Sequence, residues 1–287
     1  MSRLRQLALI TDDLEGTLSL LSEALGGAPV VERDPGVAQF GLQNGLIALG
    51  DCFLEVVAPL PEGADGASPG ARYLQRFGPS GYMVLLQVSS LRACEEQLMG
   101  GCGLAPIFAS HRGRRTPQRT YRPLSEDIPK EDGITGTHFH PKDMGCIIEV
   151  TESRPSKEWL WAGHEWLQNV QRDGGACDGL AGVVIACKNP SLVSKRWELI
   201  GNPRLDSGHA PNNAYAWTRN NDGCMFAHTT GDGQSTITFR EPLHAMESGL
   251  VEILLWLQEP RGGGASFVAC GVIFRFVSRR PKEASRL

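Results

Sequence analysis

Short apolar runs alternate with amphipathic stretches along the chain, and the first pair sets the pattern. Residues 7–10 form an apolar run of the length typical of a buried strand. Asp12 then occupies a helix-capping position, with Glu15 three residues later. Leucines recur at helical spacing from Leu14 to Leu25, and two glycines follow. The pattern predicts a strand, an acidic turn and a helix over residues 4–27.

This strand–helix order recurs, and candidate antiparallel strands bounded by Gly, Asn-Gly and Gly-Asp follow it. The predicted elements are strands at 36–41, 46–50, 52–58, 83–88, 136–140, 146–151, 180–187, 214–218, 225–228, 235–240, 250–257 and 265–277, and helices at 71–77, 91–99 and 191–200. In the fourth repeat, a glycine-rich loop at 258–264 stands where the helix would lie. Repeats of this length cannot bury their apolar faces alone. We therefore predict an α+β fold in which repeated βαβββ modules pair into curved mixed sheets with a central cleft and helices outside.

The repeats divide the chain into two unequal parts and a connector. Residues 1–152 are predicted to form a paired βαβββ domain, and residues 177–287 a second, abbreviated one. The connector, residues 153–176, contains three tryptophans, of which Trp159 and Trp161 lie two positions apart. We expect it to carry an amphipathic helix that packs between the halves. Residues 111–132 are predicted to form a long, basic, irregular loop.

Composition narrows the class of protein. The 287 residues are 41% hydrophobic and 21% charged, as in an ordinary globular protein, and the net charge of -4 argues against a general nucleic-acid binder. No run approaches the roughly 18 apolar residues of a membrane span, and the N-terminus lacks a secretory pattern. The eight cysteines are scattered without a Cys-x-x-Cys pair, which argues against a zinc ribbon or a disulfide framework. We expect a cytoplasmic protein, monomeric or homodimeric, without nucleic-acid or membrane partners.

Three segments, LRQLALITDDLEGTLSLLSEALGG, CFLEVVAPL and HFHPKDMGCIIEV, resemble the vicinal-oxygen-chelate superfamily. Its members include glyoxalase I, extradiol dioxygenases, bleomycin-resistance proteins and methylmalonyl-CoA epimerase. The resemblance is nearest to the epimerase and glyoxalase-like proteins, and covers the N-terminal half. It implies a cleft in which a divalent metal ion binds two neighbouring oxygens of a small-molecule substrate. The metal would stabilise the charge that forms when a carboxylate removes a proton.

The resemblance also implies a ligand set for this metal. The first-strand ligand falls on Gln6, and the two last-strand ligands fall on Glu55 and Glu149. Either glutamate would double as the catalytic base. The fourth position falls on Met83, whose soft thioether does not suit a hard or borderline ion.

A nearby histidine is a candidate to replace the missing ligand. His138 and His140 share a strand face, and His140 is the candidate for the metal, although it also begins the turn before Pro141. Zinc, nickel, cobalt, manganese and iron are not distinguished by these residues. In the second half the corresponding positions fall on Gly182 and Thr238, so no ligand set survives there.

The basic loop is a candidate binding site for an anionic substrate. Arg115 and Arg119 are its candidate substrate-binding residues, because guanidinium groups suit phosphates and carboxylates, including those of a CoA thioester. The alternative is a solvated loop. Met83 would line the substrate site.

Two functions of different class follow. The first is a metal-assisted isomerase, epimerase or lyase that acts on a small oxygenated substrate. The second is a metal-free protein of the bleomycin-resistance type, which sequesters a small molecule in the same cleft. A ring-cleaving dioxygenase is a third possibility, although its two-histidine, one-carboxylate iron site is not met at the aligned positions.

Overall fold

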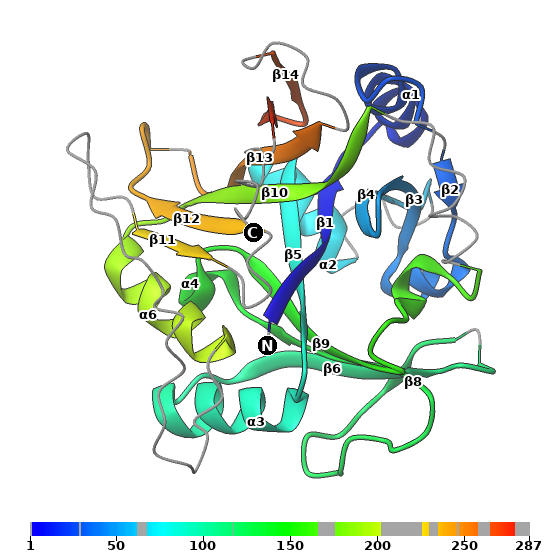
Figure 1. The fold of residues 1–287 in the computed structure, drawn as a ribbon, viewed down its shortest axis with the longest axis vertical. Helices are drawn as coiled ribbons and strands as arrows, with labels where there is room; N and C mark the ends of the chain where they lie inside the picture. Colours follow the sequence, from blue (N-terminus) through cyan, green and yellow to red (C-terminus); the bar gives the residue numbers. More distant parts are fainter. Residues whose placement is uncertain are drawn as a thin grey trace, which may run out of the picture.

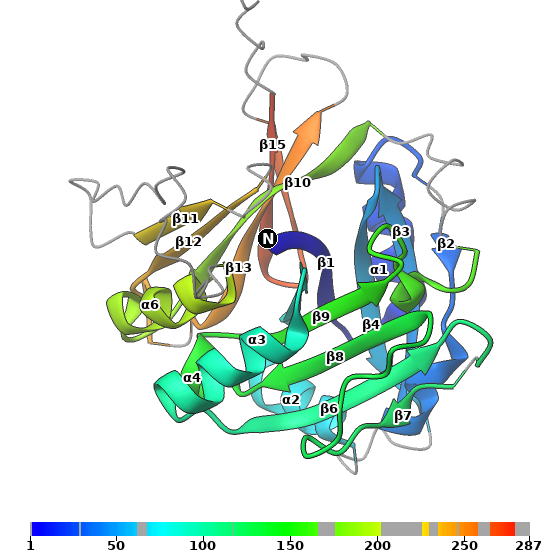
Figure 2. The same cartoon turned by 60° about the horizontal axis from the view of Figure 1, so that its bottom comes forward.

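Two mixed β-sheets with peripheral helices form the molecule (Figures 1 and 2). The computed structural model describes residues 2–28, 30–61, 68–116, 118–165, 176–201, 226–229, 235–245, 247–257 and 265–278. Of the predicted elements, the strand at 214–218 and the glycine-rich loop at 258–264 lie outside these residues. No helix in the described ranges is long and apolar enough to cross a membrane. The curved mixed sheets and outer helices confirm the predicted fold class.

The first sheet has nine strands in the order β2-β3-β4-β1-β5-β9-β8-β6-β7. They are β1 (Ser2–Ile10), β2 (Val30–Glu32), β3 (Leu42–Leu49), β4 (Cys52–Pro59), β5 (Ser80–Val88), β6 (Pro106–Gly113), β7 (Thr120–Tyr121), β8 (Gly133–Phe139) and β9 (Ile147–Arg154). β1 runs parallel to β4 and β5 runs parallel to β9, while β1 and β5 pair antiparallel at the centre. Two βαβββ modules are thus joined through their first strands. The short β7 lies within the segment predicted to be an irregular loop.

The second sheet repeats this central arrangement with fewer strands. Its order is β11-β12-β10-β13-β15-β14, formed by β10 (Cys177–Ala186), β11 (Phe226–Thr229), β12 (Thr236–Arg240), β13 (Gly249–Leu257), β14 (Ser266–Ala269) and β15 (Val272–Val277). β10 is parallel to β12 and β13 is parallel to β15, and β10 and β13 pair antiparallel.

The helices are α1 (Leu14–Ala24), α2 (Pro69–Phe77), α3 (Leu91–Glu95), α4 (Pro141–Met144) and α6 (Pro190–Gly201), with 3₁₀ turns η1 (Pro35–Phe40) and η4 (Leu160–Ala162) and a π-helical turn η3 (Glu96–Gly101) that continues α3. Of these, α1, α2, α3 and α6 lie where helices are predicted. The strand predicted at 36–41 is wrong, because the Asp34 side chain caps a 3₁₀ turn there and accepts a hydrogen bond from the Gly36 amide at 2.8 Å. The predicted cap of α1 is wrong by one residue. The side chain of Asp13, not that of Asp12, accepts a hydrogen bond from the Gly16 amide at 2.9 Å, because the helix starts at Leu14.

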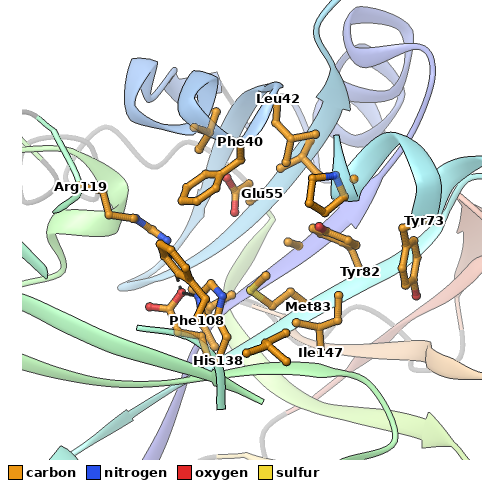
Figure 3. A pocket seen from close by; sticks show the side chains of 18 residues that line it. Phe40, Leu42, Glu55, Tyr73, Tyr82, Met83, Phe108, Arg119, His138 and Ile147 are labelled. Atoms are coloured by element: carbon orange, nitrogen blue, oxygen red, sulfur yellow. Dashed lines mark hydrogen bonds and ion pairs between the residues drawn. The ribbon is translucent and has the colours of Figure 1, made fainter. Parts of the chain in front are cut away.

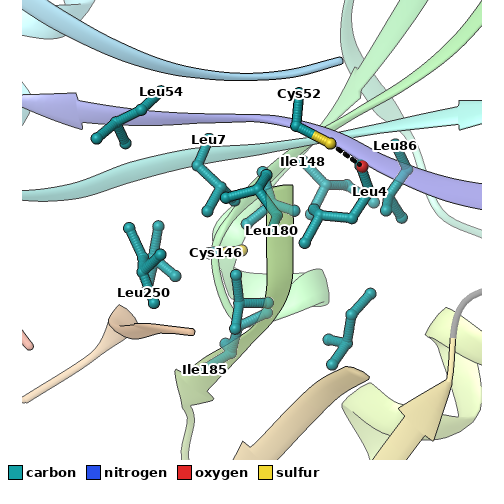
Figure 4. Packing of buried hydrophobic residues seen from close by; sticks show 14 of the residues in the cluster. Leu4, Leu7, Cys52, Leu54, Leu86, Cys146, Ile148, Leu180, Ile185 and Leu250 are labelled. Atoms are coloured by element: carbon teal, nitrogen blue, oxygen red, sulfur yellow. Dashed lines mark hydrogen bonds between the residues drawn. The ribbon is translucent and has the colours of Figure 1, made fainter. Parts of the chain in front are cut away.

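Strand alternation gives the first sheet two different faces. Alternate residues such as Glu55, Met83 and His138 face the concave side, where a cavity opens (Figure 3). Their neighbours, such as Leu54 and Ile148, face the convex side. That side packs against α1 and the second sheet in one continuous apolar core, which includes Leu4, Leu7, Leu86, Cys146, Leu180, Ile185 and Leu250 (Figure 4). Every cysteine within the described ranges is free, and Cys52 and Cys146 are buried here as core residues.

The connector enters the concave side of the first sheet. Trp159 and Trp161 are fully buried against a floor that includes Phe53 and Leu85. We call residues Trp159–Ala162 the tryptophan plug. The expectation of an amphipathic helix between the halves is wrong for these residues, which form a single 3₁₀ turn inside one sheet. Trp166 lies outside the described residues.

The two sheets lie close together at Gly81, where the absence of a side chain permits it. A Cβ atom on Gly81 of β5 would overlap the carbonyl oxygen of Leu250 on β13. Gly81 has an ordinary negative φ, so any cost of adding a methyl group comes from the close approach of the two sheets and not from backbone strain.

Substitution of Gly81 by alanine is therefore expected to separate the sheets locally. We expect Gly81→Ala to lower the free energy of unfolding by about 2 kcal/mol, the usual cost of overpacking. Urea denaturation followed by circular dichroism would measure this. Gly100→Ala is the control, because a Cβ at Gly100 meets no atom within 4 Å. Equal stability of both variants would contradict the tight packing at Gly81.

Candidate functional site

A cavity of about 430 Å³ opens on the concave side of the first sheet, beside the tryptophan plug. Its walls are mostly aliphatic and aromatic. They come from η1 (Val37, Phe40), β3 (Leu42), α2 (Tyr73), β5 (Tyr82, Met83), β6 (Ile107, Phe108) and β9 (Ile147). Figure 3 shows Arg119 and His138 toward one end of the cavity and Tyr73 at the other. A cavity of this size and character is typical of a small-molecule site.

Two β-bulges add side chains to this wall. The pairing of β1 with β5 passes from Ala8–Met83 to Leu9–Gly81 and skips Tyr82. The bulge breaks the strict alternation of side chains, so Tyr82 and Met83 both line the cavity. The same irregularity in β6 brings Ile107 and Phe108 to the cavity together.

Glu55 lies on the cavity floor in a network of amide groups. Its two carboxylate oxygens accept hydrogen bonds from Gln6 Nε2 at 2.9 Å and from Asn44 Nδ2 at 2.6 Å. The indole of Trp159 donates to Gln6 Oε1 at 2.7 Å. Because an indole N–H can only donate, it fixes the orientation of the Gln6 amide and turns the amide nitrogen toward Glu55. Burial raises the pKa of Glu55 in spite of these hydrogen bonds.

Glu149 lies across the sheet from Glu55, with β1 and β5 between their strands. It is 1% exposed. His138 Nε2 lies 2.5 Å from its Oε2, and the Thr151 hydroxyl donates to Oε1 at 2.9 Å. Burial alone would raise the pKa of Glu149, but the facing His138 and Arg119 side chains outweigh burial and lower it to about 2. Glu149 is therefore an ionised, well-compensated carboxylate.

Gly136 on β8 makes the space for this carboxylate. A Cβ atom at Gly136 would overlap Oε1 of Glu149, and the Cγ of Glu149 would lie 3.0 Å away. Any larger residue at position 136 must therefore displace the Glu149 side chain from His138.

Arg119 reaches the polar end of the cavity from the basic loop. Its guanidinium lies 3.7 Å from the ring centroid of Trp161 and 5.9 Å from that of Phe40. One of its nitrogens, Nη1, is 3.6 Å from Glu149 Oε2, an ion pair beyond ordinary hydrogen-bond length. Burial lowers the pKa of Arg119, although the Glu149 charge works in the opposite direction.

The residues that the resemblance implies as metal ligands do not fit a divalent ion. The Gln6 oxygen, the only metal-binding atom of that side chain, already accepts the Trp159 indole hydrogen. The oxygens of Glu55 and Glu149 each accept a hydrogen bond from an amide, hydroxyl or imidazole group. Arg119 brings a fixed positive charge to the same region. Within the described ranges, no three His, Cys, Asp or Glu side chains are grouped to hold a metal.

The structure brings together most of the predicted site residues. Glu55, Glu149, Met83 and Arg119 line the cavity, and Gln6 lies directly beneath Glu55. His140 and Arg115 do not line it.

Both residues that stay outside the cavity are exposed, for local reasons. His140 caps the short helix α4, where its Nδ1 accepts a hydrogen bond from the Lys142 amide at 3.0 Å. Arg115 lies on the solvent side of the basic loop. The two predicted histidines therefore differ, because His138 lines the cavity and His140 is exposed. The two predicted arginines differ in the same way, because Arg119 lines the cavity and Arg115 is exposed.

Several site residues were not singled out in the sequence. Tyr82 and Phe108 depend on bulges, which have no clear sequence signal. Asn44 lies in a predicted Asn-Gly turn, but the structure places it within β3, opposite Val57. The connector stands out in the sequence because it is rich in tryptophan. The sequence does not indicate the contact of Trp159 with Gln6, because the two residues lie 153 positions apart.

The ionisation of Glu149 predicts a specific effect of pH on stability. A carboxylate whose pKa is depressed below its ordinary 4.5 contributes stability that is present above that value and is lost as the pH falls toward 2. Between pH 4.5 and 3, the free energy of unfolding should therefore fall more steeply in the unsubstituted protein than in Glu149→Gln, by up to about 1.4 kcal/mol per pH unit. Urea denaturation at several pH values measures both slopes. Glu23→Gln, on the exposed face of α1, is the control, and parallel profiles for all three proteins would refute the assignment.

Comparison with known proteins adds information on the fold. No protein-family model matches the sequence, and no curated protein matches it significantly. A hypothetical protein from Staphylococcus aureus has a similar structure over 97% of this chain and 100% of its own, with a TM-score of 0.60 at 11% identity. A mutant of 4-hydroxymandelate synthase from Streptomyces coelicolor is similar over 90% of this chain and 71% of its own, with a TM-score of 0.56 at 13% identity. Methylmalonyl-CoA epimerase from Mycobacterium tuberculosis aligns with 52% of this chain and 87% of its own, at 22% identity and a TM-score of 0.38.

The first two similarities span both sheets, and at these identities they concern the fold alone. They agree with the paired βαβββ modules described above. The chain shares the overall fold of these two solved structures, and its paired βαβββ modules are those that the resemblance of its N-terminal half implied.

Proposed function

We propose that this protein binds a small, largely apolar molecule in the cavity of its first sheet, without a metal ion. The observation that carries the proposal is the state of the polar groups at the cavity. The oxygens of Gln6, Glu55 and Glu149, the atoms a metal would need, already accept hydrogen bonds from other side chains. This is the metal-free alternative of the sequence analysis.

The cavity itself supports ligand binding. Its volume of about 430 Å³ lies within the range of small-molecule pockets, and its walls are mainly aliphatic and aromatic. Three polar groups on its lining have unused hydrogen-bonding capacity within the described part of the chain: the Arg119 guanidinium, Nδ1 of His138 and the hydroxyl of Tyr82. Burial raises the pKa of Tyr82 to about 12, with the Glu55 charge adding to the effect, so its phenol stays protonated and can donate. Such groups orient a ligand whose body fills the apolar part.

The metal-assisted isomerase and the dioxygenase both require a metal at the polar end. A metal there would have to share the Gln6 oxygen with the Trp159 indole and Oε2 of Glu149 with the His138 imidazole. If the metal instead displaced either donor, a buried polar group would lose its partner, at a cost of about 1–3 kcal/mol per group. The geometry therefore favours the binding protein over these two functions.

Binding of a neutral apolar probe tests the proposal. We expect 1-aminoanthracene to bind one equivalent per chain, with increased fluorescence, because the cavity removes it from water. Met83→Trp, which fills the cavity, should weaken this binding by about tenfold or more. Met99→Trp adds the same bulk at a residue that is 37% exposed on the surface, and should bind the probe normally.

Chelation is part of the same experiment. Dialysis against EDTA should leave the affinity for 1-aminoanthracene unchanged. A stoichiometric divalent metal in the purified protein, together with loss of probe binding after chelation, would overturn the metal-free proposal. Equal affinity of the two tryptophan variants would place the probe elsewhere.

A metal-independent proton transfer is a second candidate, favoured by the His138–Glu149 pair. An ionised carboxylate can only accept, so Nε2 of His138 carries the hydrogen between them. In the neutral ring the lone pair is then on Nδ1, which lacks a partner among the described residues. Nδ1 would remove a proton from a carbon next to the carbonyl group of a bound ketone. The electrons of the broken C–H bond would move to the carbonyl oxygen and form an enolate. The Arg119 N–H groups would stabilise the negative charge of that enolate.

Hydrogen exchange of a bound ketone tests this second candidate. In D₂O, the protein should accelerate deuterium incorporation next to the carbonyl of 4-phenyl-2-butanone, as followed by proton NMR. His138→Gln should abolish the acceleration because its side chain cannot act as a base. His140→Gln is the control, since His140 is exposed and lies outside the cavity. Exchange at the uncatalysed rate in the unsubstituted protein would exclude the candidate and leave the binding function standing.

A further inference from the structure

The guanidinium of Arg119 is the most unusual group in the cavity. Its side chain is only 11% exposed, yet none of its five N–H groups makes a hydrogen bond within the described residues. The Trp161 ring covers the guanidinium, with 3.7 Å to the ring centroid. Stacking covers the flat face of a guanidinium and leaves its N–H groups, which point outward in the plane, free to bind a ligand.

The neighbouring charges do not satisfy Arg119. Glu149 lies 3.6 Å away, but its oxygens already accept hydrogen bonds from His138 and Thr151. Asp34 is held by Arg112 at 2.6 Å, so these two charges form their own pair.

The remaining carboxylate near Arg119 is Glu55. It accepts from Gln6 and Asn44 and makes no ion pair with Arg119 at 4 Å or less. Burial correspondingly lowers the pKa of Arg119, whereas Glu149 is well compensated. The unsatisfied group at this end of the cavity is therefore the cation.

We infer that Arg119 is the receptor for the carboxylate of a small amphipathic acid whose apolar body lies along the cavity toward Tyr73. The inference rests on the proposed binding function and names the ligand class for the same site. A carboxylate matches the bidentate edge of one guanidinium. A phosphate dianion fits less well, because a single arginine stands beside Glu149, whose negative charge opposes a second negative charge on the ligand.

The lining agrees with this orientation of the ligand. Phe40 and Phe108 line the cavity at its polar end, where their rings contact each other edge to face with centroids 5.4 Å apart, and they present apolar surface next to Arg119. Tyr73 lies at the opposite end, and its hydroxyl is already used in a hydrogen bond to the Gly81 carbonyl oxygen at 3.1 Å. That end therefore offers ring surface to an apolar tail.

Three ligands of equal size and different charge test the inference. Isothermal titration calorimetry would compare 4-phenylbutanoate, 4-phenylbutanamide and 4-phenylbutylamine. The acid should bind at least about tenfold more tightly than the amide, because it forms charge-assisted hydrogen bonds with Arg119. The amine should bind most weakly. Equal affinities of acid and amide, or preference for the amine, would overturn the inference.

Variants test whether Arg119 causes the tighter binding of the acid than of the amide. Arg119→Gln should remove the advantage of the acid over the amide but retain binding of 1-aminoanthracene. Retained dye binding would also show that the variant is folded. Arg119→Lys should keep only part of the advantage, since an ammonium neither stacks nor binds bidentately. Arg115→Gln is the matched control from the same loop, and an equal loss in that variant would also overturn the inference.

The outcomes separate this inference from the proposed function. If 1-aminoanthracene binds and the acid is no better than the amide, the cavity function holds and the carboxylate receptor fails. If the unsubstituted protein binds neither the dye nor any of the three ligands, both fail.

Discussion

The hydrogen bond from the Trp159 indole to Gln6 is the contact on which the concave side of the first sheet depends. It joins the connector to the first strand, and through the Gln6 amide it sets the hydrogen bonding of Glu55. A second set of contacts holds the same turn, because Arg112 donates to the Leu160 carbonyl at 2.8 Å and to Asp34 at 2.6 Å. The tryptophan plug is thus fastened on both sides. It fills one part of the concavity and leaves the other part as the cavity.

The boundary between plug and cavity is a layer of buried polar side chains. Burial of charges is expensive unless each has partners. Glu149 meets this requirement through His138 and Thr151, and Glu55 meets it partly through two amides. Arg119 lies on the Trp161 ring and forms an ion pair with Glu149 at 3.6 Å, beyond hydrogen-bond length. Both carboxylates therefore have hydrogen-bond donors, whereas the N–H groups of Arg119 have no hydrogen-bond acceptor among the described residues, which is why a ligand for this site should bring a negative charge.

The plug also contacts one of the residues that the family resemblance implied as metal ligands. The sequence positions implied as ligands do converge, since Gln6, Glu55 and Glu149 face the same side of the sheet. Their oxygens, however, are directed at donors of this chain. The indole of Trp159 can only donate, so it occupies the one atom of Gln6 that a metal would bind.

Local patterns in the sequence determined the strand–helix repeat and the paired sheets. These features follow from periodicity, which depends only on neighbouring residues. The positions of Gln6, Glu55 and Glu149 at the cleft were implied by the family resemblance. The cap of α1 was misplaced by one residue because Asp12 and Asp13 are both good caps. Only the tertiary structure decided the rest. The bulge at Tyr82 depends on pairing between strands, and the insertion of Trp159 depends on a contact 153 residues away along the chain. Two arginines of one loop, Arg115 and Arg119, are alike in sequence, but only Arg119 meets an aromatic face and a carboxylate, because the plug lies on that side of the loop.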